Sequence, residues 1–77
     1  MVRVLHLRNY GVYIADERGE RHHSPHAHVK ERARRIASLH LVTLEILHQI
    51  SPVPDNVMEL IRDNQELLLE EWEALNS

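Results

Sequence analysis

Four histidines stand within seven residues, in the segment His22–His28 that reads HHSPHAH. Neutral imidazole is a common metal ligand, and imidazole is also well suited to general acid–base catalysis near neutral pH. The chain holds no cysteine, which excludes thiolate zinc sites and disulfides. Three uses of the segment are open: a metal site, a catalytic or anion-binding site, and a turn whose histidines bond to backbone carbonyls.

The spacing of the histidines permits a metal site. If residues 26–31 form a strand, His26 and His28 project from one face, about 6.5–7 Å apart at Cα. A bend at Pro25 can return His22 as a third ligand, and three histidines with a water form a known catalytic zinc arrangement. The metal hypothesis therefore assigns His22, His26 and His28 to zinc or another transition metal, whereas the structural reading of the segment needs no cofactor.

Cationic side chains around the segment make anion or nucleic-acid binding the second hypothesis. A ribonuclease needs a base, an acid and a cation for the phosphorane, and His26 and His28 are the candidate catalytic residues. Tyr10 or Tyr13 would stack on a base. Whether nucleic acid is bound, and whether the protein is an enzyme, stay open. The candidate anion-binding residues are Arg21, Lys30, Arg34 and Arg35.

The first fifty residues carry the alternation of apolar and polar residues that predicts strands. Tyr10, Val12 and Ile14 share one face of their strand. Later, Ile36, Ser38 and His40 are expected to lie opposite Ala37, Leu39 and Leu41. Asn9 is the expected first turn. The predicted strands cover 2–7, 10–15, 26–31 and 35–41, with a polar turn at 31–35, and 43–50 is either a strand or a short helical turn.

The last part of the chain has helical spacing, from about residue 54 to residue 75. Its apolar residues form one stripe, which predicts an amphipathic helix packed on the sheet. Asn64 and Gln65 fall at the centre of that stripe. Either the helix reaches past the sheet there, or the two amides bond to loop backbone, because an unpaired buried amide costs about 1–3 kcal/mol.

These elements predict one α+β domain spanning 1–77, with strands over about 2–50. The expected architecture is a small antiparallel sheet of three to five strands packed by one long C-terminal helix. We see no signal peptide pattern and no apolar run of the roughly 18 residues that a membrane span needs. The expected location is therefore the cytoplasm, without membrane attachment.

Charge divides the chain into two unequal parts. Residues 1–50 carry eight Arg and Lys against five Asp and Glu, a net charge of +3. Residues 51–77 carry one Arg against seven acidic residues, a net charge of −6, and the whole chain has −3. The basic part is able to face an anionic partner and the acidic helix a basic one, although ordinary solvated surfaces have such patterns too.

The order YGVYI, HHSPHAHV, IASLHLVTLEIL and NQELLLEEW resembles the small bacterial family known as domain of unknown function 4160. The match runs from about Tyr10 to Trp72, and its core is Pro25-His26-Ala27-His28. The resemblance implies a small α+β protein, often encoded beside another short protein as in toxin–antitoxin pairs. A cognate small protein partner is therefore expected, and a homo-oligomer is an open alternative. The structural residues it singles out are Pro25, Asn64 and Trp72.

Overall fold

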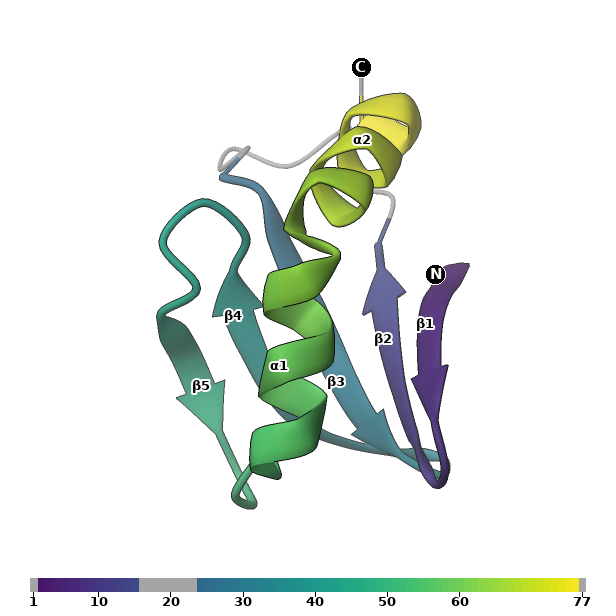
Figure 1. The fold of residues 1–77 in the computed structure, drawn as a ribbon, viewed down its shortest axis with the longest axis vertical. Coiled ribbons are helices and arrows are strands. Elements are labelled where there is room, and N and C mark those ends of the chain that lie inside the picture. Colours follow the sequence, from purple (N-terminus) through teal and green to yellow (C-terminus); the bar gives the residue numbers. More distant parts are fainter. Residues whose placement is uncertain (1, 16–23, 77) are drawn as a thin grey trace.

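The computed structural model describes residues 2–15 and 24–76. Five strands form one antiparallel sheet, in which every strand pairs with its neighbour in the sequence (Figure 1). The predicted α+β class and antiparallel sheet are therefore confirmed, with the largest expected number of strands. The strands are β1 (Val2–Leu7), β2 (Tyr10–Ile14), β3 (His26–Glu31), β4 (Arg34–His40) and β5 (Ile46–Gln49).

Two tight turns at one end of the sheet connect β1 to β2 and β3 to β4. Each has its first residue in the left-handed region, with φ of 54° at Arg8 and 56° at Arg32. The turn expected at Asn9 is confirmed, and the one expected over 31–35 is shorter, because the strands continue to Glu31 and resume at Arg34. The Arg32 backbone N–H donates to the Asn9 carbonyl oxygen at 2.7 Å, which ties the two turns together.

The prediction of one long C-terminal helix is wrong, because two helices occupy this part of the chain. The first, α1, covers Asp55–Asp63, and the second, α2, covers Gln65–Asn76. Asn64 between them has φ −117° and ψ 22°, outside helical values. Its side-chain amide donates to the Leu60 carbonyl oxygen at 2.8 Å, an example of a short polar side chain competing with the helix ladder. The chain changes direction at this point (Figure 1).

Gln65 explains the second polar residue in the apolar stripe. Its amide nitrogen donates to the carbonyl oxygens of Leu41 at 2.6 Å and Val42 at 2.9 Å. The expectation that an amide bonds to loop backbone is therefore confirmed for Gln65. The bonds attach the start of α2 to the turn that follows β4.

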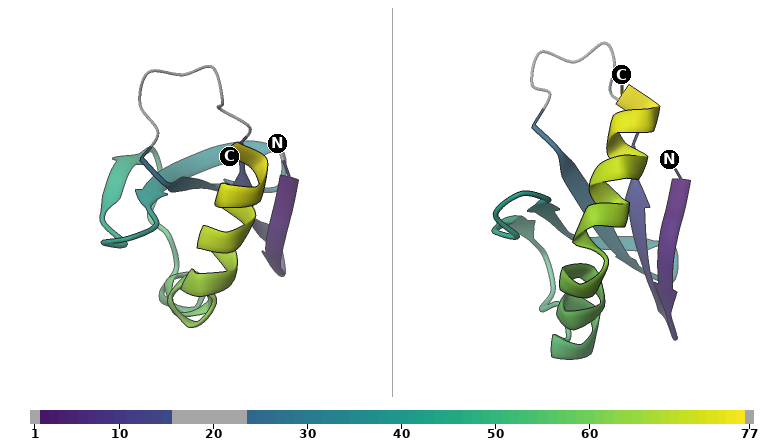
Figure 2. Two further views of the ribbon diagram at one scale, coloured as in Figure 1. Left: turned by 90° about the horizontal axis from the view of Figure 1, so that it is seen from above. Right: turned by 45° about the horizontal axis from the view of Figure 1, so that its top comes forward.

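Both helices lie on the same face of the sheet (Figure 2). They bury Val57, Ile61 and Leu68, each with no exposed surface, against apolar side chains of the strands. This is the face that Tyr10, Val12 and Ile14 share, as predicted. The buried strand residues in this core are Val12, Ile14, Ala27, Val29, Ile36, Ala37 and Leu39, with Leu41 just after β4.

One residue departs from the expected alternation. Alternation predicts Ile36 on the face of Ser38, but Ile36 is buried in the core beside Ala37. The pairing of β3 with β4 shifts here, since Val29 pairs with Ala37 whereas Lys30 pairs with Arg35. The extra residue is a β-bulge, which turns Ile36 from the opposite face into the core. No helix in the described part of the chain is long and apolar enough to cross a membrane.

Candidate functional site

The histidines of the described residues lie on the face of the sheet that the helices leave uncovered. On β3, Ala27 and Val29 point into the core, so His26, His28 and Lys30 project from the other side. The predicted common face of His26 and His28 is therefore present. We call the helix-free surface the histidine face; it comprises Arg3, His6, Tyr13, His26, His28, Lys30, Arg35, Ser38, His40 and His48.

Strand register aligns one row of these residues across the sheet. His28 lies opposite Tyr13 on β2 and opposite Ser38 on β4. Ser38 in turn lies opposite His48 on β5, and Tyr13 lies opposite Arg3 on β1. Because directly paired residues point to the same side of an antiparallel sheet, the row places an aromatic ring, two imidazoles and a hydroxyl on one surface.

The Tyr13 ring leans along its strand over Gly11. A β-carbon at Gly11 would lie 2.7 Å from Cε1 of Tyr13 and 3.2 Å from Cδ of Arg3, so glycine is what lets the ring settle here. The Lys30 ammonium nitrogen stands 4.9 Å from the centroid of the same ring, in a cation–π contact. Tyr13 is thus held between the backbone of β2 and a cation.

The His26 and His28 rings meet edge to face, with centroids 5.2 Å apart. The Nδ1 atom of His26 lies 2.9 Å from the Ser24 carbonyl oxygen. Since a carbonyl only accepts, Nδ1 carries the proton in this bond, which fixes the orientation of the ring. His28 is 7% exposed, so its ring is surrounded by neighbours and His26 is the more accessible of the two.

His40 lies opposite His26 but serves the turn after β4. The backbone N–H groups of Val42 and Thr43 donate to its Nδ1 at 3.1 and 3.4 Å. An imidazole nitrogen that accepts a hydrogen bond carries no proton there, so His40 is held as the tautomer protonated at Nε2. His40 is consequently a turn-stabilising residue at the margin of the histidine face.

The four predicted anion-binding residues are not gathered together. Lys30 is on the histidine face, and Arg35 lies opposite it on β4 and is exposed. Arg34 pairs with Glu31 at the turn, in the row that reaches Tyr10 on the other face. Arg21 lies outside the described residues. Of the described residues in the rows of the histidine face, none is acidic.

The described residues contain no group of three or more His, Cys, Asp or Glu side chains able to hold a metal ion. The predicted set of His22, His26 and His28 requires His22, which lies outside the described residues. Among the described residues, only the neighbouring His26 and His28 represent that set.

Tyr10 takes no part in the histidine face, because it packs against the core on the helix side. Partial burial, the negative charge of Glu31 and a hydrogen bond donated to the Glu31 carboxylate together raise the pKa of Tyr10 above its usual 10.0. Of the two tyrosines proposed for stacking, only Tyr13 is on the surface with the histidines. Glu31, by contrast, is engaged with Tyr10.

The three predicted structural residues have distinct contacts. The Pro25 carbonyl oxygen accepts the Leu41 N–H at 2.9 Å, which closes the end of the β3–β4 pair. Asn64 lies at the helix break, as described above, and its amide donates to the Leu60 carbonyl oxygen. Trp72 is half-buried against the core, and its indole nitrogen is buried without a hydrogen-bond partner in the described part of the protein.

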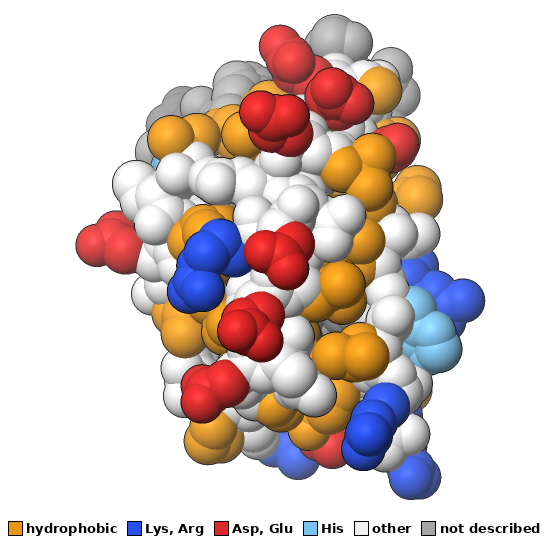
Figure 3. All heavy atoms as spheres, in the orientation of Figure 1, with side chains coloured by type: hydrophobic (Ala, Val, Ile, Leu, Met, Phe, Trp, Pro, Cys, Tyr) orange, Lys and Arg blue, Asp and Glu red, His pale blue; other side chains and the backbone are white. Residues whose placement is uncertain are grey.

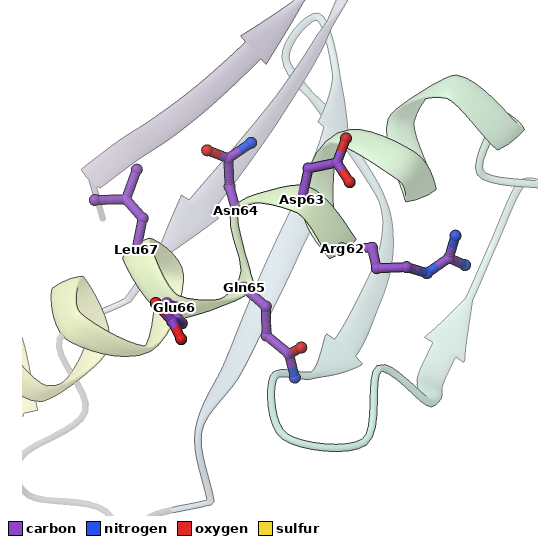
Figure 4. Close-up of a pocket in the computed structure, with 6 residues that line it drawn as sticks. All are labelled: Arg62, Asp63, Asn64, Gln65, Glu66 and Leu67. Atoms are coloured by element: carbon purple, nitrogen blue, oxygen red, sulfur yellow. The ribbon is translucent and has the colours of Figure 1, made fainter.

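A shallow hollow lies at the junction of α1 and α2, on the helix side of the sheet (Figure 4). Its walls mix both signs of charge, and the Gln65 side chain that extends into the region is already bonded to the loop. The hollow is therefore better explained by the helix break than by a ligand. The residues around it are Arg62, Asp63, Asn64, Gln65, Glu66 and Leu67.

The helix side has the opposite charge character. Acidic side chains follow the helices along much of this surface, with few cations among them (Figure 3). The predicted acidity of the last part of the chain is thus visible on the helix side of the molecule.

The sequence pattern does not single out His48 and Ser38 as members of the site. His48 falls in a segment whose pattern fits both a strand and a helical turn, and Ser38 is only one position in an alternation. The repeated polar residues at Ser38 and His40 are a usable signal, but only strand pairing brings them beside His28.

The chain belongs to the family described as Domain of unknown function (DUF4160), whose model matches residues 9–73. The matched region extends from the turn before β2 through most of α2, and thus includes His26, His28 and Trp72. Comparison with curated proteins and with solved structures gives no match.

Proposed function

We propose that this protein is a cytoplasmic component of a toxin–antitoxin-like pair and that it binds RNA through the histidine face. The observation that supports RNA binding is the register of the sheet, which groups Tyr13, Lys30 and Arg35 without a carboxylate in the described rows. Cations neutralise phosphates, and aromatic rings stack on unpaired bases. Resemblance to a family often encoded beside a second short protein supports the pairing.

Binding of a fluorescein-labelled single-stranded RNA of mixed sequence, followed by anisotropy, tests the RNA hypothesis. The double variant Lys30→Gln/Arg35→Gln should bind more weakly, and its dependence on salt should be shallower by about 0.7 in log–log slope for each phosphate that is no longer neutralised. Arg62→Gln is the matched control, since Arg62 is exposed on α1. Equal weakening in the control, or no RNA binding by the wild type, would contradict the proposal.

Co-expression tests the pairing separately. The protein should co-purify with the short protein encoded next to it when only one of the two carries a tag. Failure to co-purify at low and at moderate salt would reject the pairing and leave RNA binding untouched.

RNA cleavage is a second candidate function, favoured by the contact between the His26 and His28 rings beside Lys30. One imidazole would take the 2′-hydroxyl proton and the other would protonate the leaving 5′-oxygen, giving a 2′,3′-cyclic phosphate. His26→Gln should lower the cleavage rate by about 10²-fold or more, with RNA affinity preserved. An unchanged rate would exclude His26 from catalysis, and absence of cleavage by the wild type would reject the activity.

A further inference from the structure

Strand β5, at one edge of the sheet, exposes apolar side chains. Ile46 is 42% exposed, Leu47 is 55% exposed, and Ile50 just beyond the strand is 54% exposed. An edge strand also has backbone N–H and C=O groups on its outer side, which are able to pair with another strand. Residues 46–50, which we call the β5 edge, therefore offer backbone pairing and apolar contact in the same place.

The two edges of the sheet are not equivalent. Along β1, Arg3 and Arg8 are exposed, and the pairing with β2 shifts between Arg3 and Leu5. Charges and bulges of this kind discourage pairing with other chains. The β5 edge also has an irregular register, at Leu47, but it contains no Lys, Arg, Asp or Glu. Of the two edge strands, only β5 therefore lacks the charged side chains that discourage pairing with another chain.

We propose that the β5 edge binds a second copy of this chain, as an antiparallel β5–β5 pair around a two-fold axis. The segment carries no charge of its own beyond the imidazole of His48, so pairing it with itself brings no Lys, Arg, Asp or Glu together. Pairing of β5 with β1 of another copy would place Arg3 beside apolar side chains and would leave both ends open for filaments. The symmetric contact closes on itself and covers Leu47 and Ile50 in both copies.

The geometry of this pair has a consequence for the histidine face. The two-fold axis of an antiparallel strand pair is perpendicular to the sheet, so both copies keep their helices on one side. The two histidine faces then join on the other side, with His48 of each copy near the axis. If the histidine face binds RNA, as proposed above, the dimer offers twice the length of surface to one strand.

The short contact implies a weak dimer. A stable complex usually buries about 1,200–2,000 Å² in total, and a pair of five-residue edges falls below that range. We therefore expect a dissociation constant of roughly 10–1,000 μM for the dimer, as for weak, transient complexes.

Sedimentation velocity from about 10 μM to 1 mM, the range set by the expected affinity, tests the dimer on the untagged full chain. The weight-average sedimentation coefficient should rise toward that of a dimer for the wild type and should stay at the monomer value for Leu47→Lys. Leu67→Lys is the control, because Leu67 is an apolar residue on α2 with 39% exposure, and it should behave as the wild type. Circular dichroism shows whether each variant is folded. If Leu47→Lys does not fold, Ile50→Lys takes its place.

Three results would overturn the dimer: a wild type that stays monomeric to 1 mM, a Leu47→Lys variant that still associates, or equal loss in Leu67→Lys. RNA anisotropy at low protein concentration separates failure of the dimer from failure of RNA binding. At such a concentration the protein is monomeric, and the monomer is expected to bind RNA whether or not the β5 edge associates at higher concentration.

Discussion

Replacing Gly11 by Ala should displace the Tyr13 ring and weaken the histidine face. The added β-carbon would lie 2.7 Å from Cε1 and 3.2 Å from Cζ of Tyr13, which is too close for the ring to stay where it is. If the ring moves outward it leaves the Lys30 ammonium, which is 4.9 Å from its centroid. Overpacking costs about 1–3 kcal/mol in a closed core, and about 1 kcal/mol is expected here because Tyr13 is only half-buried.

Two smaller effects adjust this free energy. Disruption of the cation–π interaction adds about 0.5–1 kcal/mol at an exposed site. Gly11 does not have positive φ, so alanine fits the backbone and regains about 0.4–1 kcal/mol from the unfolded chain. The net destabilisation expected is about 1 kcal/mol, which lowers the Tm of a domain this size by about 4–8 °C.

A double-mutant cycle with Tyr13→Ala tests whether the clash with the Tyr13 ring causes the destabilisation. Chemical denaturation followed by the fluorescence of Trp72 gives the free energy of unfolding for the wild type, both single variants and the double variant. If the clash with the ring is the cause, Gly11→Ala should be neutral or stabilising once Tyr13 is alanine. A stabilising Gly11→Ala in the wild type, or the same destabilisation in both backgrounds, would exclude the clash as the cause.

Three further predictions concern the scaffold. Gln65→Leu should lower the free energy of unfolding by about 1–3 kcal/mol, because two loop carbonyl oxygens lose their amide donor, whereas the exposed Glu66→Ala should change it by less than about 0.5 kcal/mol in denaturant titrations. Leu68→Ala should cost about 2–5 kcal/mol, since Leu68 is fully buried; a similar effect in Leu67→Ala would contradict the assigned helix face. The raised pKa of Tyr10 means that the unfolded chain loses this proton first, so stability falls as pH rises from about 10 through the folded-state pKa. Tyr10→Phe should therefore lose stability less steeply across alkaline pH, and a melting series with identical slopes would exclude the contribution.

The sheet could be predicted because its strands alternate and are short. Residues 2–7 and 26–31 have the predicted boundaries, whereas alternation left 43–50 open between a strand and a helical turn, and the structure has β5 over Ile46–Gln49 there. The helix break could not, because the apolar stripe continues across Asn64 with helical spacing. Two hydrogen bonds made at the break cannot be read from spacing: the Asn64 amide bonds to the Leu60 carbonyl oxygen, and the Gln65 amide bonds to the turn after β4, which is distant in the sequence.

The candidate site was predictable only within one strand. Alternation places His26 and His28 together, but it says nothing about which strands flank them. The strand register in the structure places Tyr13 of β2 and Ser38 of β4 beside His28. It also places His48 of β5 beside Ser38. Arg34 was expected with the other cations, but it lies in the row of Glu31 and Tyr10 because the bulge at Ile36 shifts the end of β4.

The RNA-binding role of the histidine face is best tested by titrating the isotope-labelled protein with RNA and following its amide chemical shifts. We expect the shifts to concentrate on β2, β3 and β4, around Tyr13, His28 and Lys30, and to diminish as salt is raised. Shifts centred on α1 and α2, or no shifts at low salt, would show that the histidine face is not the RNA-binding surface.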